Sequence, residues 1–444
     1  MRHFSALGEI YNLKDEYAKG RLIGLADAVI TACYNVFITG VFYTGFLSMY
    51  GMSISDVGII TFIPYIANCF SVFSSSVLDH FKRRKPILIA AKIFFYAMYI
   101  LATTLMPLVV QAPNARLIWF AIILFAAHAI YALFSPGFTT WFYVFYPADN
   151  EHRTRYIVYN HIISSITSSA LLFFSGLLTD AFANSPKQNA LILGFRYFAF
   201  VLVLLDVGLQ ACAKEEPHTK DAKVRLREVF TLPFHYRKFL LCMLLMFAWN
   251  FVSNLNNGLW NYHLLNHIHF SYTLLNTVTM MYTVILLLFN RFWQKLLRKY
   301  SWIKTFGIAN LLWVPTELIF FFITQERTWM YFRTCMFQNF LNAGLNLAYA
   351  NVLYMNLPEE NSTTHIAFSS VGCNLFAFFG LLLGTKVSAI GGDTPNMLLG
   401  MPVYTVQYTL LMRAGFLLIL GLILTLDWKR FTRDEDIQAI EARK

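Results

Sequence analysis

The sequence predicts an all-α integral membrane protein in which twelve transmembrane helices form two pseudo-symmetric six-helix bundles. Its composition suits a bilayer: 57% of the 444 residues are hydrophobic, 17% are aromatic and only 13% are charged, which leaves too little polar surface for a soluble domain. The apolar residues come in twelve long blocks, and a helix needs roughly 20 such residues to cross a hydrocarbon core of about 30 Å. Basic residues also collect in every second loop between the blocks.

The twelve blocks are separated by short charged clusters. They cover residues 22–48, 55–79, 86–110, 116–145, 156–182, 188–213, 238–265, 272–297, 303–324, 328–356, 363–390 and 404–427. The fourth, seventh and tenth blocks are the most polar. A polar group in hydrocarbon is costly unless the helix bundle or water surrounds it, so we expect their polar side chains to face the inside of the bundle.

The net charge of +11 is compatible with nucleic-acid binding, but its distribution indicates a membrane protein instead. Basic residues recur in alternate loops, whereas the opposite loops hold little more than Arg116, Lys187 and Arg327. By the positive-inside rule both termini are cytoplasmic, which requires an even number of spans. We therefore expect a multi-pass protein of the plasma membrane, in contact with the lipid bilayer and with no nucleic-acid partner.

The sequence offers no site for enzyme chemistry, a cofactor or a metal. The six cysteines lie inside predicted spans without C-x-x-C spacing, so they are expected to be buried apolar side chains. No P-loop, zinc-protease signature, Gly-x-Ser-x-Gly elbow or nucleotide-binding fingerprint occurs. His263 and His267 have metal-ligand spacing near the outer end of the seventh block, but without a carboxylate or cysteine alongside them they predict a hydrated interfacial cluster.

A charged segment, Lys214–Lys238, lies between the sixth and seventh blocks and so divides the twelve blocks into two sets of six. A weak repeat supports this division, since Pro147-Ala-Asp-Asn150 precedes the fifth span and Pro358-Glu-Glu-Asn361 precedes the eleventh. The first block is too long for a cleavable signal sequence and is expected to remain as the first span. The predicted parts are a cytoplasmic leader (1–21), an N-terminal six-helix bundle (22–213), a cytoplasmic linker (214–237), a C-terminal six-helix bundle (238–427) and a cytoplasmic tail (428–444).

Two loops at corresponding places of the halves carry related motifs. The loop from Ser75 to Lys85 reads SSVLDHFKRRK and is similar to the pattern G-x-x-x-D-R-x-G-R-K, while the loop from Trp293 to Trp302 is similar to W-x-x-L-x-D-R-x-G-W with Arg298 in place of the acid. With the span count, orientation, linker and repeat, the chain resembles the major facilitator superfamily over essentially its whole length. The resemblance implies alternating access, with spans 1, 4, 7 and 10 around a central cavity.

The same resemblance implies a cytoplasmic gate in the loop between spans 2 and 3. A carboxylate near the start of a facing helix is favoured by the helix dipole and by neighbouring cations, and opening would break these contacts. The alternative is that the basic cluster only fixes the topology. The predicted gate residues are Asp79, Lys82, Arg83, Arg84, Lys85, Arg153 and Arg155.

Amides and aromatic rings in spans 7 and 10 predict a substrate site. Four amides of span 7 recur at i, i+4, i+7 and i+11, which places them along one face of a continuous helix. Amides both donate and accept hydrogen bonds, so the mixture suits a neutral polyhydroxylated solute such as a sugar; the alternative is that they only join helices. The predicted site residues are Asn35, Asn250, Asn254, Asn257, Trp260, Asn261, Gln338, Asn342 and Asn346.

Charged and titratable groups inside spans are candidates for ion coupling. Asp27 lies on a predicted cavity helix, where it is expected either to carry a proton or to pair with a cation at the interface. His128, near the middle of span 4, is either a proton acceptor or a packed hydrogen-bonding side chain. Glu317 and Arg333 lie at similar depth across a short hairpin and are predicted to form a structural ion pair. Arg196, Asp206 and Arg413 are expected to be peripheral, where they snorkel or pair within the bundle.

Together these features predict a monomeric secondary transporter of a small polar organic solute, coupled to H⁺ or another cation such as Na⁺. Two alternatives remain open from the sequence: an exporter of amphipathic compounds, favoured by the many aromatic residues, and a membrane sensor that transports nothing. The amide pattern argues against the exporter. The lack of a recognisable appended soluble domain argues against the sensor.

Overall fold

The computed structural model describes residues 11, 16–183, 185–215, 226–358, 362–398, 400–432 and 437–438. Most of the predicted leader 1–21, much of the linker 214–237 and most of the tail beyond 432 lie outside the described residues. The described chain forms twelve helical segments of membrane-crossing length in sequence order, with short helices before the seventh and after the twelfth.

Among the first six segments, the second contains a 3-10 turn and the third contains a π-helical turn. They are α2 (Glu16–Ile38) with α3 (Gly40–Met49); α4 (Ile54–Asn68) with the 3-10 turn η1 (Cys69–Phe73) and α5 (Ser74–Leu78); α6 (Lys85–Tyr96) with the π-helical η2 (Ala97–Ala102) and α7 (Thr103–Val109); α8 (Pro113–Tyr143); α9 (Asn150–Ala181); and α10 (Pro186–Ala211).

The last six segments begin after α11 (Leu226–Thr231) and the 3-10 turn η3 (Leu232–His235). They are α12 (Arg237–Ser253) with α13 (Leu259–Tyr262) and the π-helical η4 (His263–His267); α14 (Tyr272–Tyr300); α15 (Trp302–Phe321); α16 (Thr328–Met355), preceded by the 3-10 turn η5 (Gln325–Arg327); α17 (Ser362–Gly391); and α18 (Thr405–Leu426), followed by α19 (Trp428–Phe431).

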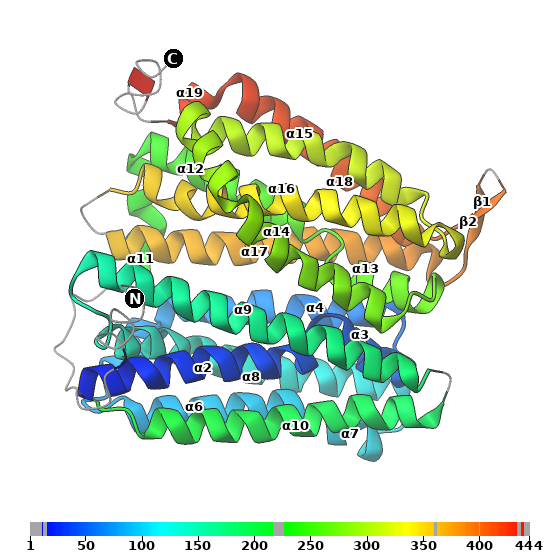
Figure 1. Cartoon of the computed structure of the whole chain (residues 1–444), viewed down its shortest axis with the longest axis horizontal. Helices are drawn as coiled ribbons and strands as arrows, with labels where there is room; N and C mark the ends of the chain where they lie inside the picture. Colours follow the sequence, from blue (N-terminus) through cyan, green and yellow to red (C-terminus); the bar gives the residue numbers. More distant parts are fainter. Residues whose placement is uncertain are drawn as a thin grey trace, which may run out of the picture. The chain divides into compact units, whose positions relative to one another are not determined.

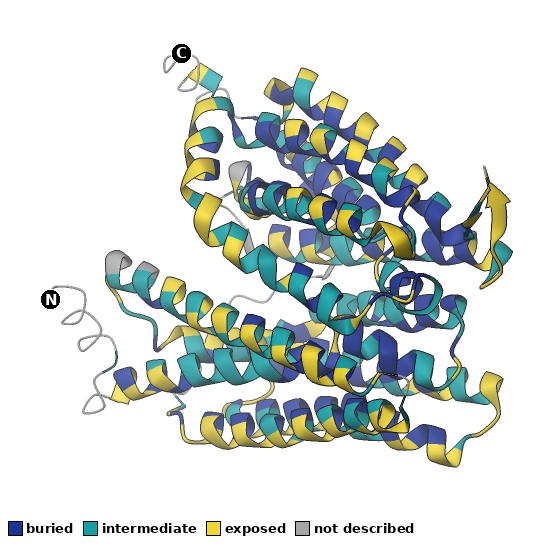
Figure 2. Ribbon diagram, turned by 45° about the vertical axis from the view of Figure 1, so that its right-hand side comes forward, coloured by how far each residue is buried: buried dark blue, intermediate teal, exposed yellow. Residues whose placement is uncertain are grey.

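Within the described residues, nine of the segments are long and apolar enough to cross a membrane by length and composition. The bent pair Arg227–His235 and Arg237–Ser253, with 113° between its parts, makes a tenth if it is counted as one span. Helices α15 and α16 interrupt their apolar sequence with polar side chains such as Asn310, Glu317 and Asn342. Exposed residues recur along one side of the long helices (Figure 2), and on α10 and α18 many of them are large and apolar, which suits contact with lipid.

Packing divides the chain into two compact units. We call Met1–Tyr50 with Phe70–Lys223 unit 1, and Gly51–Cys69 with Val224–Lys444 unit 2. Helix α4 groups with unit 2 because it packs along α17. The domain bounds predicted from the sequence, 22–213 and 238–427, remain predictions.

In unit 1, helix α10 packs against α2 and α6, and α2 also packs against α9 (Figure 1). The fully buried Arg196 of α10 bonds to the π-helical turn η2 and the residue after it: its Nη2 donates to the carbonyl of Tyr99 at 3.0 Å and to the hydroxyl of Thr103 at 2.8 Å. Its guanidinium lies 3.9 Å from the ring centroid of Phe46. Arg196 therefore pairs within the bundle instead of snorkelling to the interface.

In unit 2, the main helix pairs are α15 with α18, α14 with α16, and α12 with α17. A large apolar core joins α12, α14, α15, α16 and α18. Two glycines of α17, Gly380 and Gly384, lie against the backbone carbonyls of Phe251 and Leu255, where a Cβ atom would collide. The close approach of α17 to α12 therefore depends on glycine at these positions.

A small β-hairpin, absent from the all-helical prediction, precedes α18. Strand β1 (Asn396–Leu398) pairs antiparallel with β2 (Met401–Val403), with Met397 opposite Pro402. The hairpin stands at the end of α17 and the start of α18 (Figure 1).

The seventh segment is not the continuous helix that the sequence analysis expected. Helix α12 ends at Ser253, residues 254–258 form turns, and α13 begins at Leu259. Gly258 has φ of +77°, a conformation that side-chain-bearing residues avoid. The neighbouring amides also compete with the helix for backbone groups, as Asn254 does by donating from Nδ2 to the carbonyl of Asn250 at 2.9 Å.

The single helical face predicted for the four amides of span 7 is therefore wrong. A spacing of i, i+4, i+7 and i+11 aligns side chains only along an unbroken helix. Asn250 lies on α12, Asn254 and Asn257 lie in the turns, and Asn261 lies on α13.

Candidate functional site

A buried charged network in unit 1 joins three helices. Lys92 of α6 places its Nζ atom 2.6 Å from Oδ2 of Asp206 on α10 and 3.2 Å from Oδ1 of Asp27 on α2. Both Lys92 and Asp206 are buried, with side-chain exposures of 5% and 0%, whereas the Asp27 side chain is 28% exposed. The network therefore carries two carboxylates and one ammonium, and only one of the carboxylates reaches the surface of the unit.

Neutral groups complete the surroundings of this network. Gln210 donates from Nε2 to Oδ1 of Asp27 at 2.6 Å, and the hydroxyl of Thr31 donates to the same oxygen at 3.4 Å. The Lys92 ammonium also lies 5.5 Å from the ring centroid of Phe138 on α8. Asp27 thus pairs with a cation of the bundle interior, Lys92, and not with an interfacial arginine.

The second predicted coupling residue, His128, lies away from this network. Its ring packs edge-on against Phe95 at 4.9 Å and Tyr99 at 5.6 Å between centroids. Its Nε2 atom is buried without a hydrogen-bond partner. The structure does not join His128 to Asp27, and its role in coupling stays a prediction.

The loop predicted to form a gate is an ordered cluster within unit 1. Arg84 donates from Nη2 to Oδ1 of Asp79 at 3.1 Å. The Glu215 carboxylate accepts hydrogen bonds from the backbone amides of Arg84 and Lys85 at the start of α6, where a helix dipole favours an anion. Lys85 in turn donates from Nζ to the carbonyl of Ala213 at 2.8 Å.

The remaining predicted gate residues do not bond to Asp79 in the contacts described. Arg153, in the first turn of α9, donates to the carbonyls of Pro147 and Ala148 in the preceding loop at 3.0 and 3.2 Å. Lys82 and Arg83 are exposed beside the cluster. Glu215, which the sequence analysis did not single out, is the acid that ties this loop to the end of α10.

In unit 2, the break after α12 carries a cluster of amides around one tyrosine of α4. The Tyr65 hydroxyl donates to Oδ1 of Asn254 at 2.5 Å and accepts from Nδ2 of Asn257 at 2.9 Å. Asn257 also donates to Oδ1 of Asn254 at 3.2 Å and is exposed, while Asn254 and Tyr65 are half-buried. The cluster contains donors and acceptors but no charge among these three side chains.

The other predicted amides have separate partners. Asn250 donates to the hydroxyl of Tyr349 at 2.6 Å, and Asn346, which is exposed, donates to the hydroxyl of Tyr282 at 2.8 Å. Gln338 donates to the hydroxyl of Thr316 at 2.8 Å. The four remaining predicted residues, Asn35, Trp260, Asn261 and Asn342, are all half-buried.

The predicted ion pair between Glu317 and Arg333 is wrong. Glu317, fully buried on α15, lies 3.3 Å from Nη1 of Arg413 on α18 and accepts from Nε1 of Trp313 at 2.7 Å. Arg333 is exposed, with its guanidinium 5.1 Å from the ring centroid of Trp329. The reason is that α15 packs most extensively against α18, so the buried acid meets the cation of that helix.

The fold and these sites define a multi-pass membrane protein, built from long apolar helices with polar clusters inside each of two units. The chain belongs to the family described as MFS/sugar transport protein, whose model matches residues 20–356. Membership confirms the predicted major facilitator fold, the all-α membrane class, and secondary transport by alternating access in place of enzyme activity. A comparison with curated proteins gives no match.

Solved structures of transporters share the fold at low sequence identity. A mutant of the nucleoside transporter NupG aligns with a TM-score of 0.68 and 13% identity, over 94% of this chain and 100% of that one. A bacterial homologue of the iron transporter ferroportin, in an inward-facing state, gives 0.66 and 12%, over 95% and 100%. The xylose transporter XylE from E. coli, in an inward-open conformation, gives 0.63 and 13%, over 95% and 98%.

Proposed function

We propose that this protein transports a small neutral polyhydroxylated solute, of the sugar or nucleoside class, in symport with protons. The observation that carries the proposal is the cluster of Tyr65, Asn254 and Asn257 at the break of the seventh span. The family description as a sugar transport protein and the structural likeness to a nucleoside transporter and a xylose transporter support the same solute class.

The chemistry of this cluster suits hydroxyl groups. Breaking a membrane helix frees backbone groups, and such breaks are tolerated where they line a cavity or are buried in protein. The exposed side-chain amide of Asn257 donates to Tyr65 and Asn254 within the cluster. It can exchange one of these partners for a solute hydroxyl, because an amide offers two N–H donors and two acceptor lone pairs. A charged solute would instead require a cation or carboxylate beside these side chains, and a neutral one does not.

For the coupling ion we propose a proton carried by Asp27. The network of Asp27, Lys92 and Asp206 has one net negative charge when both carboxylates are ionised. Asp27 is the carboxylate of the network that reaches the surface of unit 1, so we assign the transported proton to it; a proton bound there removes the net charge and leaves the Lys92–Asp206 pair in place. The ion pair between α2 and α6 is then weakened, which provides a way for proton binding to favour one conformation of the transporter.

We further propose that the cluster around Asp79 and Arg84 is the cytoplasmic gate of unit 1, with Glu215 as its second acid. The contacts that support this role join the loop before α6 to the end of α10. In the same proposal the protein is a monomer of the plasma membrane with both termini in the cytoplasm.

A ligand-stabilisation experiment with a matched variant tests the solute site. A solute that binds the folded protein raises its apparent melting temperature in detergent by mass action. We expect D-xylose or uridine to stabilise the wild type. Tyr65→Phe should weaken binding by up to about thirtyfold, because the lost hydroxyl positions both amides through two hydrogen bonds of about 1 kcal/mol each.

The matched control is Tyr99→Phe, which removes a buried hydroxyl that donates to the carbonyl of Ile38 at 3.0 Å in unit 1. It is expected to lower stability without changing the concentration of solute needed for half-maximal stabilisation. Equal weakening in both variants would contradict a solute site at Tyr65. Stabilisation by lipophilic cations and not by either polar solute would favour an exporter.

A further inference from the structure

At the end of α13 in unit 2, two histidines and one aspartate form a linear chain of hydrogen bonds. Nε2 of His267 lies 2.9 Å from Oδ1 of Asp393, and Nδ1 of His267 lies 2.9 Å from Nδ1 of His263. Asp393 follows α17 in a turn where Gly392 has φ of +55°. The carboxylate that sequence reasoning found missing beside His263 and His267 thus comes from more than a hundred residues further along the chain.

The order of these bonds fixes the position of each proton. The Asp393 carboxylate accepts, so Nε2 of His267 carries a proton and Nδ1 of a neutral His267 is an acceptor. Nδ1 of His263 must then donate to it, which leaves Nε2 of a neutral His263 as an acceptor. The ring of Tyr404 stacks on the ring of His267, with centroids 3.9 Å apart and planes inclined by 7°, and so fixes the orientation of the His267 ring.

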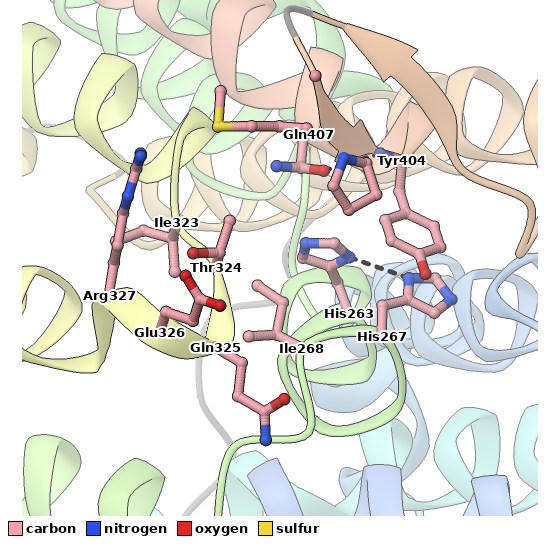
Figure 3. A pocket seen from close by; sticks show the side chains of 13 residues that line it. His263, His267, Ile268, Ile323, Thr324, Gln325, Glu326, Arg327, Tyr404 and Gln407 are labelled. Atoms are coloured by element: carbon pink, nitrogen blue, oxygen red, sulfur yellow. Dashed lines mark hydrogen bonds between the residues drawn. The ribbon is translucent and has the colours of Figure 1, made fainter.

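The free nitrogen of His263 faces a pocket. The His263 side chain is only 1% exposed, and its Nε2 atom has no hydrogen-bond partner. The pocket has a volume of about 420 Å³ and is lined by η4, the loop before α16, and the segment from β2 into α18. Figure 3 shows His263 on its wall beside Gln407 and Thr324, with Glu326 and Arg327 further out on the loop.

We propose that this pocket is a second solute site, in which a hydroxyl group of a neutral sugar-like molecule donates a hydrogen bond to Nε2 of His263. A buried acceptor without a partner is costly, and a solute hydroxyl removes that cost. The volume suits a molecule of one or two sugar rings. Ile268, Ile323 and Tyr404 provide apolar surface for the ring faces, and Thr324 adds a hydroxyl to the lining (Figure 3).

The neighbouring groups argue against a metal ion or an anion as the occupant. Within the described part of the chain, no group of three His, Cys, Asp or Glu side chains is arranged to hold a metal. The lining carries one acid and one base, Glu326 and Arg327, both exposed, so it has no net charge when its two histidines, His263 and His267, are neutral. An anion would also meet the acceptor lone pair of His263, which repels it.

The solute class rests on the proposed function, because the same molecule would meet this pocket and the site at Tyr65. The orientation proposed from the positive-inside rule places the linker in the cytoplasm, so the seventh segment starts there and ends at the outer face. The pocket lies at that end and therefore opens toward the outer face. The pocket would then hold the solute at the outer end of unit 2.

Chemical labelling of His263 tests the proposal on the intact protein. Diethyl pyrocarbonate acylates an imidazole nitrogen that has a free lone pair, so at pH 7 it is expected to label His263, as read by peptide mass spectrometry. We expect saturating D-xylose or maltose to slow this labelling at least severalfold. Asp393→Ala is expected to slow it roughly twofold without solute, because both tautomers of His263 then become available.

His128 is the matched control, since its Nε2 atom is also buried without a partner but its ring packs against Phe95 and Tyr99 and does not line this pocket. It should remain unlabelled. Three results would each overturn the proposal. They are no labelling of His263 while the exposed His80 reacts, equal labelling of His263 and His128, and labelling of His263 that neither sugar slows. Protection that persists in Tyr65→Phe would separate this pocket from the site at Tyr65, and stabilisation by sugar without protection of His263 would leave the proposed function standing.

Discussion

Replacing Lys92 by methionine tests the charged network of unit 1 most sharply. Methionine has a similar length and no charge, so it removes the cation from between Asp27 and Asp206 and fills most of its space. At 2.6 Å the Lys92–Asp206 attraction is about 6 kcal/mol at an effective dielectric constant near 20. Desolvation offsets much of that gain in the intact protein, but the variant leaves a carboxylate with no exposed side-chain surface unpaired.

The expected loss of stability for Lys92→Met is about 3–5 kcal/mol, the usual cost of removing one partner of a buried pair. The double variant Lys92→Met with Asp206→Asn should recover a large part of it, because the second change removes the stranded charge. Apparent melting temperatures of the wild type, both single variants and the double variant, in one detergent and at one scan rate, give the comparison. An unchanged melting temperature for Lys92→Met, or a double variant less stable than Lys92→Met, would refute this account of the network.

Three further stability predictions use the same measurement. Arg413→Met should lower the apparent melting temperature strongly because it strands the buried Glu317, whereas Arg333→Met should change it little; the reverse order would restore the pairing expected from the sequence. Gly384→Ala should cost about 1–3 kcal/mol, since the added methyl group collides with a backbone carbonyl of the break, and an unchanged value would show that α12 and α17 can separate. Arg196→Met should cost about 1–3 kcal/mol by removing the bonds of the guanidinium to the carbonyl of Tyr99 and to the hydroxyls of Thr103 and Thr104, and full stability would contradict that role.

The fold followed from the sequence because its strongest signals are local. Long apolar blocks and alternating basic loops depend on the bilayer alone, so they do not require knowledge of which helices touch. The hairpin at 396–403 was missed because its two strands have only three residues each, too few for an alternating pattern to be recognised.

The break in the seventh span shows where a local pattern misleads. A helical spacing of amides assumes a helix, yet Gly258 and the adjacent asparagines favour turns. Their clustering and Gly258 were visible in the sequence and could have signalled an interruption, but the helical spacing was followed instead. The partner that organises the cluster, Tyr65, could not be inferred, because its contact with Asn254 joins residues 189 positions apart.

Charged partners were the hardest to predict for the same reason. Asp27 was identified from its depth in a span, but its pairing with Lys92 and Asp206 depends on how α2, α6 and α10 meet. Glu317 was recognised as buried and paired, and the wrong cation was chosen because Arg333 lies closer in the sequence than Arg413. A buried charge can be predicted from one helix, whereas its partner requires the packing of two.

The most direct test of proton-coupled solute transport is uptake into proteoliposomes. With radiolabelled D-xylose or uridine outside and an imposed pH gradient, acid outside, we predict accumulation above the outer concentration by the wild type. Asp27→Asn should retain solute binding and exchange of solute across the membrane but lose accumulation, because its side chain cannot take up a proton. Accumulation that ignores the pH gradient, or that Asp27→Asn leaves intact, would contradict the account.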